Sequence, residues 1–163
     1  MAINTPLIAE LTSESISTRK LLERVPFDNP SWVPHERSMT LSKLAYHIAD
    51  IPVWILRILA ADEFDFANNP PMKIAENNHT LIQHFEAKLN GALESLQQAS
   101  DADFDKIWVV KRNGTVMMQF PKKVAIRGWA FNHLIHHRGQ LSVYLRLLNV
   151  SIPGMYGPSA DEQ

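Results

Sequence analysis

The sequence predicts an all-α protein, a four-helix bundle with a small β-hairpin insertion before its last helix. Apolar residues recur at steps of three and four along four segments, which is typical of amphipathic helices. The connections between these segments are long enough to cross over, and one of them contains a hairpin signal. A chain of 163 residues with 45% hydrophobic residues is large enough to bury one core, so residues 1–163 are expected to form a single domain.

The first helix is expected to begin with Thr5 as its N-cap and Pro6 in its first turn, and to end near Val25-Pro26. Proline has no N–H to lose at this position, because the first N–H groups of a helix have no partner within it. Residues 27–39 contain two prolines and are predicted to form a loop.

The second helix is predicted from Thr40 to about Ala61, with Pro52 in its interior. Proline cannot donate to the carbonyl of Ile48 and crowds it, so a kink is expected one turn after His47. Either the kink only curves the helix around the core, or it opens room beside a metal ion.

A polar connection at 62–77 leads to the third helix, where apolar residues between Leu81 and Leu96 keep helical spacing. Further on, β-forming residues flank Asn113-Gly114 within 107–120, which is the strongest short signal for a hairpin. An isolated hairpin is marginally stable, so this one is expected to lie on the bundle or on a neighbouring subunit.

The fourth helix is predicted from Pro121 to about Asn149 and carries His133 and His137, a His-x-x-x-His pair. Residues four apart lie on the same face of a helix, one turn apart, so both imidazoles can grip one metal ion. Apolar and aromatic neighbours keep the same spacing, which predicts that the pair faces the core. Stacked, hydrogen-bonded core histidines are the alternative.

Two ligands on one helix rarely complete a metal site, and His47 is the best candidate for a third. It shares a stripe of the second helix with Leu44 and Ile51, which is expected to face the core. The histidines at 35, 79 and 84 are expected at the surface.

Composition excludes several classes of function. A net charge of −1 provides no general attraction to nucleic acid or anionic membranes. The chain has no cysteine, so a metal site must use imidazole, carboxylate, amide or water, and thiol chemistry must use an external thiol. The N-terminus lacks the pattern of a signal peptide, and no stretch approaches the roughly 20 apolar residues of a membrane span. A cytoplasmic location is therefore expected.

The chain resembles the DinB-like family of bacterial four-helix-bundle metalloproteins over nearly its whole length. The resemblance rests on the segment around His47, on Asn132 to Gln140, and on the Pro-Gly-x-Tyr-Gly-Pro run of the tail. It implies an up-down-down-up bundle, often a homodimer, with a divalent ion on His47, His133 and His137 and water in the open position. Relatives in the wider superfamily use metal-bound low-molecular-weight thiols.

Four further residues are candidates for the surroundings of the ion. Asp50 either orients the ring of His47 by accepting a hydrogen bond from it or is exposed to solvent. His136 either packs in the core, contacts one of the metal ligands or takes part in a dimer contact. Gln140 and Tyr144 are candidates for the cavity lining, with core packing favoured for Tyr144. Arg138 either clamps a substrate anion or forms an ordinary surface ion pair, and the ion pair is favoured.

Three neutral nitrogen ligands leave an ion its full +2 charge and an open position, which acidifies bound water or binds a thiol as thiolate. Imidazole ligands favour zinc or nickel, with iron and manganese as alternatives. The first hypothesis is a metal-dependent enzyme that activates water or an external thiol, for S-transfer to a small-molecule electrophile. Position 134 is Leu where zinc proteases carry the catalytic Glu, so hydrolysis ranks lower. The second is a non-enzymatic stress-response protein with a structural metal, and the third a metal-free interaction module.

Overall fold

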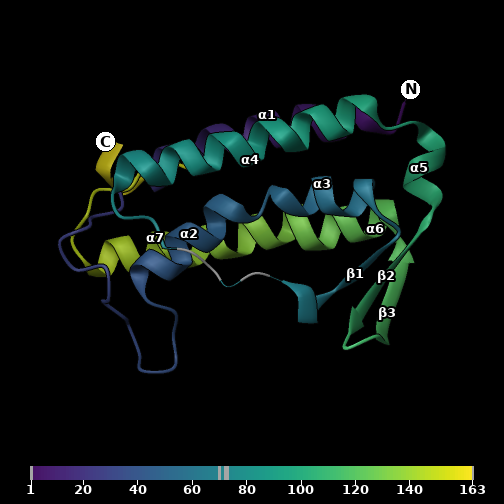
Figure 1. Ribbon diagram of the computed structural model, residues 1–163. Helices are drawn as coiled ribbons and strands as arrows, with labels where there is room; N and C mark the ends of the chain where they lie inside the picture. Colours follow the sequence, from purple (N-terminus) through teal and green to yellow (C-terminus); the bar gives the residue numbers. More distant parts are fainter. Residues whose placement is uncertain (1, 70, 72–73, 163) are drawn as a thin grey trace.

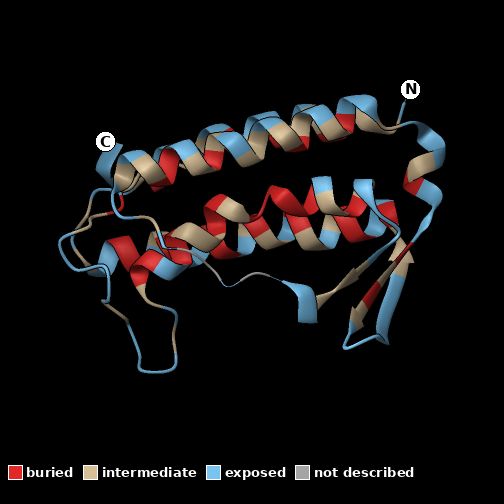
Figure 2. Cartoon of the chain, in the orientation of Figure 1, coloured by how far each residue is buried: buried red, intermediate tan, exposed pale blue. Residues whose placement is uncertain are grey.

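The computed structural model describes residues 2–69, 71 and 74–162. Within them the fold is mostly helical, with a small sheet at one end of the long helices (Figure 1). Helices α1 and α4 form one layer, and the helical segments α2, α3, α6 and α7 lie beneath it. Buried residues gather on the sides where the two layers face each other (Figure 2). None of the helices in the described part of the chain has both the length and the apolar character needed to cross a membrane.

Helices α1 (Asn4–Leu22) and α4 (Asn78–Gln98) run antiparallel. The side chain of Asn4 donates to the carbonyl of Leu96 at 3.1 Å, and Asn78 donates to the carbonyl of Leu22 at 2.9 Å. Each helix start is therefore tied to the end of the other helix.

The prediction that Thr5 is the N-cap of α1 is wrong. The N-cap is Ile3, without a side-chain cap, and Thr5 lies inside the first turn. The backbone N–H of Ile3 instead donates to Asp101 at 2.7 Å, from the short helix α5 (Asp101–Asp105). A tertiary contact thus takes the place of the local cap that the sequence suggested.

The second helix is divided into α2 (Leu41–Asp50) and α3 (Val53–Ala60), as the interior proline predicted. Thr40 caps α2 by accepting from the backbone N–H of Lys43 at 3.3 Å. Pro52 has no N–H to donate to the carbonyl of Ile48. At the break this carbonyl instead accepts from the N–H of Ile51 at 3.3 Å.

The predicted hairpin is present as β2 (Ile107–Arg112) and β3 (Thr115–Pro121), which pair antiparallel. Asn113 and Gly114 both have positive φ, 51° and 76°, as a tight turn between twisted strands requires. The sheet has a further strand that the sequence analysis did not predict, β1 (Glu63–Asp65), which pairs in parallel with β2. A three-residue strand carries too little pattern to be recognised without its partner.

The segment predicted as one long fourth helix has three parts: α6 (Lys122–Ile126), the π-helical η2 (Arg127–Asn132) and α7 (His133–Leu147). A π-helix is wider than an α-helix, and such segments occur frequently at functional sites. Here it directly precedes His133, the first histidine of the pair.

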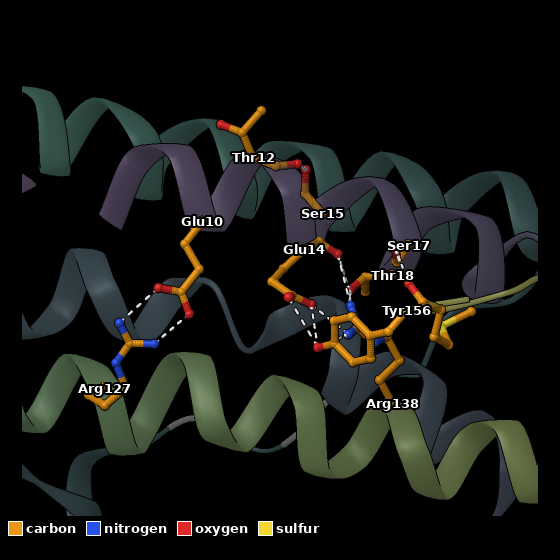
Figure 3. Close-up of polar contacts among 10 residues, drawn as sticks. Glu10, Thr12, Glu14, Ser15, Ser17, Thr18, Arg127, Arg138 and Tyr156 are labelled. Carbon is orange, nitrogen blue, oxygen red and sulfur yellow. Dashed lines mark hydrogen bonds and ion pairs between the residues drawn. The ribbon is translucent and has the colours of Figure 1, made fainter. Parts of the chain in front are cut away.

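The expectation that Arg138 forms a surface ion pair is wrong, because its side chain is only 2% exposed. Its guanidinium pairs with the carboxylate of Glu14 at 2.5 Å and donates to the hydroxyls of Thr18 at 3.2 Å and Tyr156 at 2.6 Å (Figure 3). These contacts join α7 to α1 and to the C-terminal tail. Helical spacing placed Arg138 next to a core residue but did not show that α1 carries a matching acid.

Candidate metal centre

The structure brings His47 of α2 together with His133 and His137 of α7. One nitrogen from each ring lies within 4.8 Å of the other two. The Nε2 atoms of His47 and His133 are 3.0 Å apart, and the three ring centroids are separated by 4.6–4.8 Å. Among the described residues this is the only group of three or more His, Cys, Asp or Glu side chains so arranged.

Hydrogen bonds at the outer nitrogens assign the tautomers of two rings. The Nδ1 atom of His133 lies 3.2 Å from the carbonyl of Trp129, and Nδ1 of His137 lies 2.7 Å from the amide oxygen of Gln140. Both partners are acceptors, so each Nδ1 carries the proton. The Nε2 atoms of His133 and His137 are therefore left with lone pairs, which is the form that ligates a metal.

The surroundings also keep the imidazoles neutral. Burial, together with the other two imidazoles, lowers the pKa of His47 to about 4. Burial likewise lowers the pKa of His133 and of His137. The hydrogen bonds of these rings to the Trp129 carbonyl and to Gln140 raise the pKa, but the effect of burial is larger. At neutral pH all three imidazoles are therefore uncharged, so no imidazolium repels a cation at this site.

These residues fit a divalent ion in donor chemistry and in spacing. Zinc–nitrogen bonds of about 2.0–2.1 Å in a tetrahedral site place nitrogen atoms about 3.3 Å apart. The Nε2 atoms of His47 and His133 lie 3.0 Å apart, close to that separation, and a nitrogen of His137 lies no more than 4.8 Å from its two counterparts.

The four residues expected around the ion have different surroundings. Gln140 is exposed and contacts His137 as described, whereas the exposed His136 stacks edge-on against His137 with centroids 4.8 Å apart. Tyr144 is 9% exposed and donates to the carbonyl of Met39 at 3.2 Å, in the core. Asp50 is half-buried and accepts from His84 at 2.9 Å rather than from His47.

The expectation that His84 is a surface residue is wrong. Its side chain is 22% exposed, pairs with Asp50 and stacks on Tyr46 with ring centroids 4.4 Å apart. The sequence placed His84 on α4, but only the packing of α4 against α2 brings these partners together. The histidines at 35 and 79 are exposed, as predicted.

A cavity of about 590 Å³ is lined in part by His47 and His133. Its lining combines two of the candidate ligands with aromatic and charged side chains, most of which the sequence analysis did not single out. These residues are Tyr46, His47, Asp50, Trp54, Arg57, Phe66, Asn69, Pro71, His84, Lys88, Trp129 and His133. A signal was available, since positions 47, 50, 54 and 57 recur at steps of three and four and so share one helix face.

Fold and site together define a mostly helical protein with a three-histidine group beside a small-molecule-sized cavity. The sequence profile of the DinB family matches residues 1–163, and the chain belongs to this family. The resemblance noted from the sequence is thereby confirmed.

The chain is also similar to known proteins and solved structures over most of its length. The chain is 24% identical to the uncharacterized protein YrdA of Bacillus subtilis strain 168 over 153 residues, covering 91% of this chain and 85% of YrdA. It is 23% identical to the uncharacterized protein YjoA of the same strain, covering 90% and 91%. A DinB-like protein from Bacillus cereus ATCC 10987 superposes with a TM-score of 0.72 at 25% identity, covering 95% of this chain and 98% of that one. The structure of the DinB-like YjoA superposes with a TM-score of 0.71 at 18% identity, covering 98% and 99%, and so shares the fold.

Proposed function

We propose that this protein is a divalent-metal-dependent enzyme in which His47, His133 and His137 hold the ion. The observation that carries the proposal is the arrangement of the His133 and His137 Nε2 lone pairs beside Nε2 of His47. Zinc or nickel is favoured by the all-imidazole donor set, with iron or manganese as alternatives. An ion bound there supplies Lewis acidity to a water or to a thiol sulfur.

The reaction we propose is S-transfer from an external low-molecular-weight thiol to a small electrophile. The thiol proton passes to solvent, the sulfur forms a bond to carbon, and the leaving group departs with its electron pair. The absence of cysteine supports this assignment, because no internal thiolate competes for the ion. The cavity beside His47 and His133 supplies space for a substrate.

In this reaction the protein's own side chains orient the ligands and hold the substrate. Gln140 and the Trp129 carbonyl fix the rings of His137 and His133 through their Nδ1 protons. Trp54, Phe66 and Trp129 give part of the cavity an apolar wall against which a substrate can pack.

A second candidate is a protein in which the metal is structural and the role is in the stress response. A structural role for the metal is favoured by the position of the ligands. His47 and His133 come from different helices, so an ion bound to both would cross-link α2 to α7. Removal of metal would then lower the melting temperature without abolishing an activity.

We further infer the up-down-down-up order of the helices, which the antiparallel pair α1 and α4 supports. The homodimer and the cytoplasmic location stay predictions from the sequence and the family resemblance.

The test begins with metal content by plasma mass spectrometry, on protein purified without chelator or affinity tag. Stoichiometric metal is expected in the wild type and in the control His79→Ala, which alters an exposed histidine. It is expected to be lost in the His133→Ala, His137→Ala double variant. Protein that takes up no zinc, nickel, iron or manganese on reconstitution would overturn both metal-based roles.

Activity is then measured with 1-chloro-2,4-dinitrobenzene and a small thiol. The proposed enzyme forms the thioether above the uncatalysed rate only when metal and thiol are both present, and the double variant does not. A filled site that never accelerates the reaction with any thiol or electrophile would favour the structural role.

A further inference from the structure

One face of the kinked helix α2–α3 lines the cavity from the candidate metal centre to its opposite end. His47, Asp50, Trp54 and Arg57 follow one another at steps of three and four, and all contact the cavity. At a rise of 1.5 Å per residue, about 15 Å of helix separates His47 from Arg57. The cavity therefore has a nitrogen-ligand end and a distinct second end.

Beyond the candidate ligands, the cavity lining carries an excess of positive charge, with Arg57 and Lys88 against the single acid Asp50. Lys88 of α4 lies 4.0 Å from the carboxylate of Asp50, which already accepts from His84 at 2.9 Å. No carboxylate of the described residues lies within 4.0 Å of Arg57, although Asp50 is near enough for Arg57 to lower its pKa. One carboxylate of the lining is thus set against two bases, Arg57 from its own helix and Lys88 from α4.

The guanidinium of Arg57 lies over two aromatic rings. It lies 4.9 Å from the centroid of Trp54 and 5.3 Å from that of Phe64. A guanidinium packed against aromatic faces keeps the N–H groups at its edge free to donate. Such an edge matches the two oxygens of a carboxylate.

Aromatic rings occupy the wall between the two ends. The centroids of Trp54 and Trp129 are 5.0 Å apart, and Phe66 lies 6.1 Å and 5.6 Å from them. These three side chains come from α3, η2 and the 3-10 turn η1 (Phe66–Asn68), and all three line the cavity. A flat, apolar body is the ligand shape that such a wall accommodates.

We propose that the cavity binds a planar aromatic or conjugated small molecule that carries a carboxylate. The carboxylate contacts Arg57 and Lys88, the rings of Trp54, Phe66 and Trp129 pack against the flat body, and the far end of the molecule points toward the three histidines. This inference rests on the proposed function for the identity of that reacting end, whereas the binding of the carboxylate requires no metal.

The test is isothermal titration calorimetry on the full-length protein with 2-naphthoate and its neutral analogue 2-naphthylmethanol. Both are titrated into protein freed of metal by chelation and into metal-loaded protein. Naphthoate is expected to bind in both states, about tenfold or more tightly than the alcohol, since hydrogen bonds to charged groups contribute that much. The variants Arg57→Gln and Lys88→Gln are expected to weaken naphthoate about tenfold and to leave the alcohol unchanged.

Two further variants serve as controls for fold and charge. Lys43→Gln removes an exposed base of α2 that does not line the cavity, and naphthoate binding is expected to stay at the wild-type value. Arg57→Lys keeps the charge and is expected to recover part of the affinity lost in Arg57→Gln. The circular dichroism spectrum of each variant shows whether the helices are retained.

Three results would overturn the inference: equal affinity for the acid and the alcohol, wild-type affinity in folded Arg57→Gln and Lys88→Gln, or naphthoate binding only to the metal-loaded protein. The last result would show that the carboxylate binds the ion. Failure of the proposed function is separate, because a protein without metal or turnover would still bind naphthoate through Arg57.

Discussion

Replacing Glu14 with glutamine tests whether the buried ion pair between α1 and α7 stabilises the fold. Glu14 is 13% exposed and Arg138 is 2% exposed, and their side chains meet at 2.5 Å (Figure 3). The hydroxyl of Tyr156 accepts from Arg138 at 2.6 Å and donates to the Glu14 carboxylate at 3.0 Å. Glu14→Gln keeps the shape of the side chain but leaves the guanidinium without its counter-charge.

The loss of stability in Glu14→Gln depends on which hydrogen bonds Arg138 retains. Removing one partner of a buried pair costs about 3–5 kcal/mol, because the other charge stays buried and uncompensated. Arg138 still donates to the backbone carbonyl of Glu14 at 3.0 Å and to Thr18 at 3.2 Å, so we expect the lower end, about 3 kcal/mol. In a chain of this size that corresponds to a fall in melting temperature of about 6–12 °C.

The same two helical layers offer a matched control. Glu10 of α1 pairs with Arg127 of η2 through two contacts, at 2.5 and 2.8 Å, but these side chains are 33% and 44% exposed. Glu10→Gln is expected to cost less than about 1 kcal/mol, because solvent screens an exposed pair. Urea and thermal denaturation, followed by circular dichroism, measure both variants.

The reasoning would be refuted if Glu14→Gln cost no more than Glu10→Gln. A double variant Glu14→Gln, Arg138→Met removes the stranded charge, so it is expected to be more stable than Glu14→Gln alone. A double variant that is less stable would show that packing by Arg138, and not its charge, dominates.

Three other perturbations address the site and the tail. Gln140→Leu removes the acceptor for Nδ1 of His137 and is expected to weaken metal affinity about 10–100-fold in competition with a chelating dye, an effect that Gln140→Glu should not reproduce. The pKa of His47 is lowered to about 4 in the folded protein from the unfolded value of 6.5, so the unfolded state binds more protons between these two pH values. The stability of the metal-free protein should therefore fall as the pH drops from 6.5 to about 4. His47→Gln should flatten this dependence of stability on pH, and an unchanged slope in urea titrations would contradict the prediction. Gly154→Ala places a Cβ 2.2 Å from the carbonyl oxygen of Gly157 and should expose the tail to limited proteolysis, whereas Gly157→Ala, with open space around it, should not.

Local patterns in the sequence were sufficient for most of the secondary structure. Helical spacing, the start of the second helix at Thr40 and the kink at Pro52 were predicted, because each depends on residues within one or two turns. The Asn113-Gly114 turn was predicted for the same reason, since its positive φ angles are a property of those two residues. The π-helical η2 was not predicted, because its widened turn has no comparable residue signal.

The sequence by itself determined that the chain is helical and that His133 and His137 lie one turn apart, because the geometry of a single helix places them so. It also singled out His47, through the resemblance and the apolar stripe around it. Only the tertiary structure decided that these three rings meet, that Asp50 pairs with His84, and that Arg138 is buried beside Glu14. These contacts join residues 34 to 124 positions apart, and such distances are set by how helices pack and not by the period of any one helix.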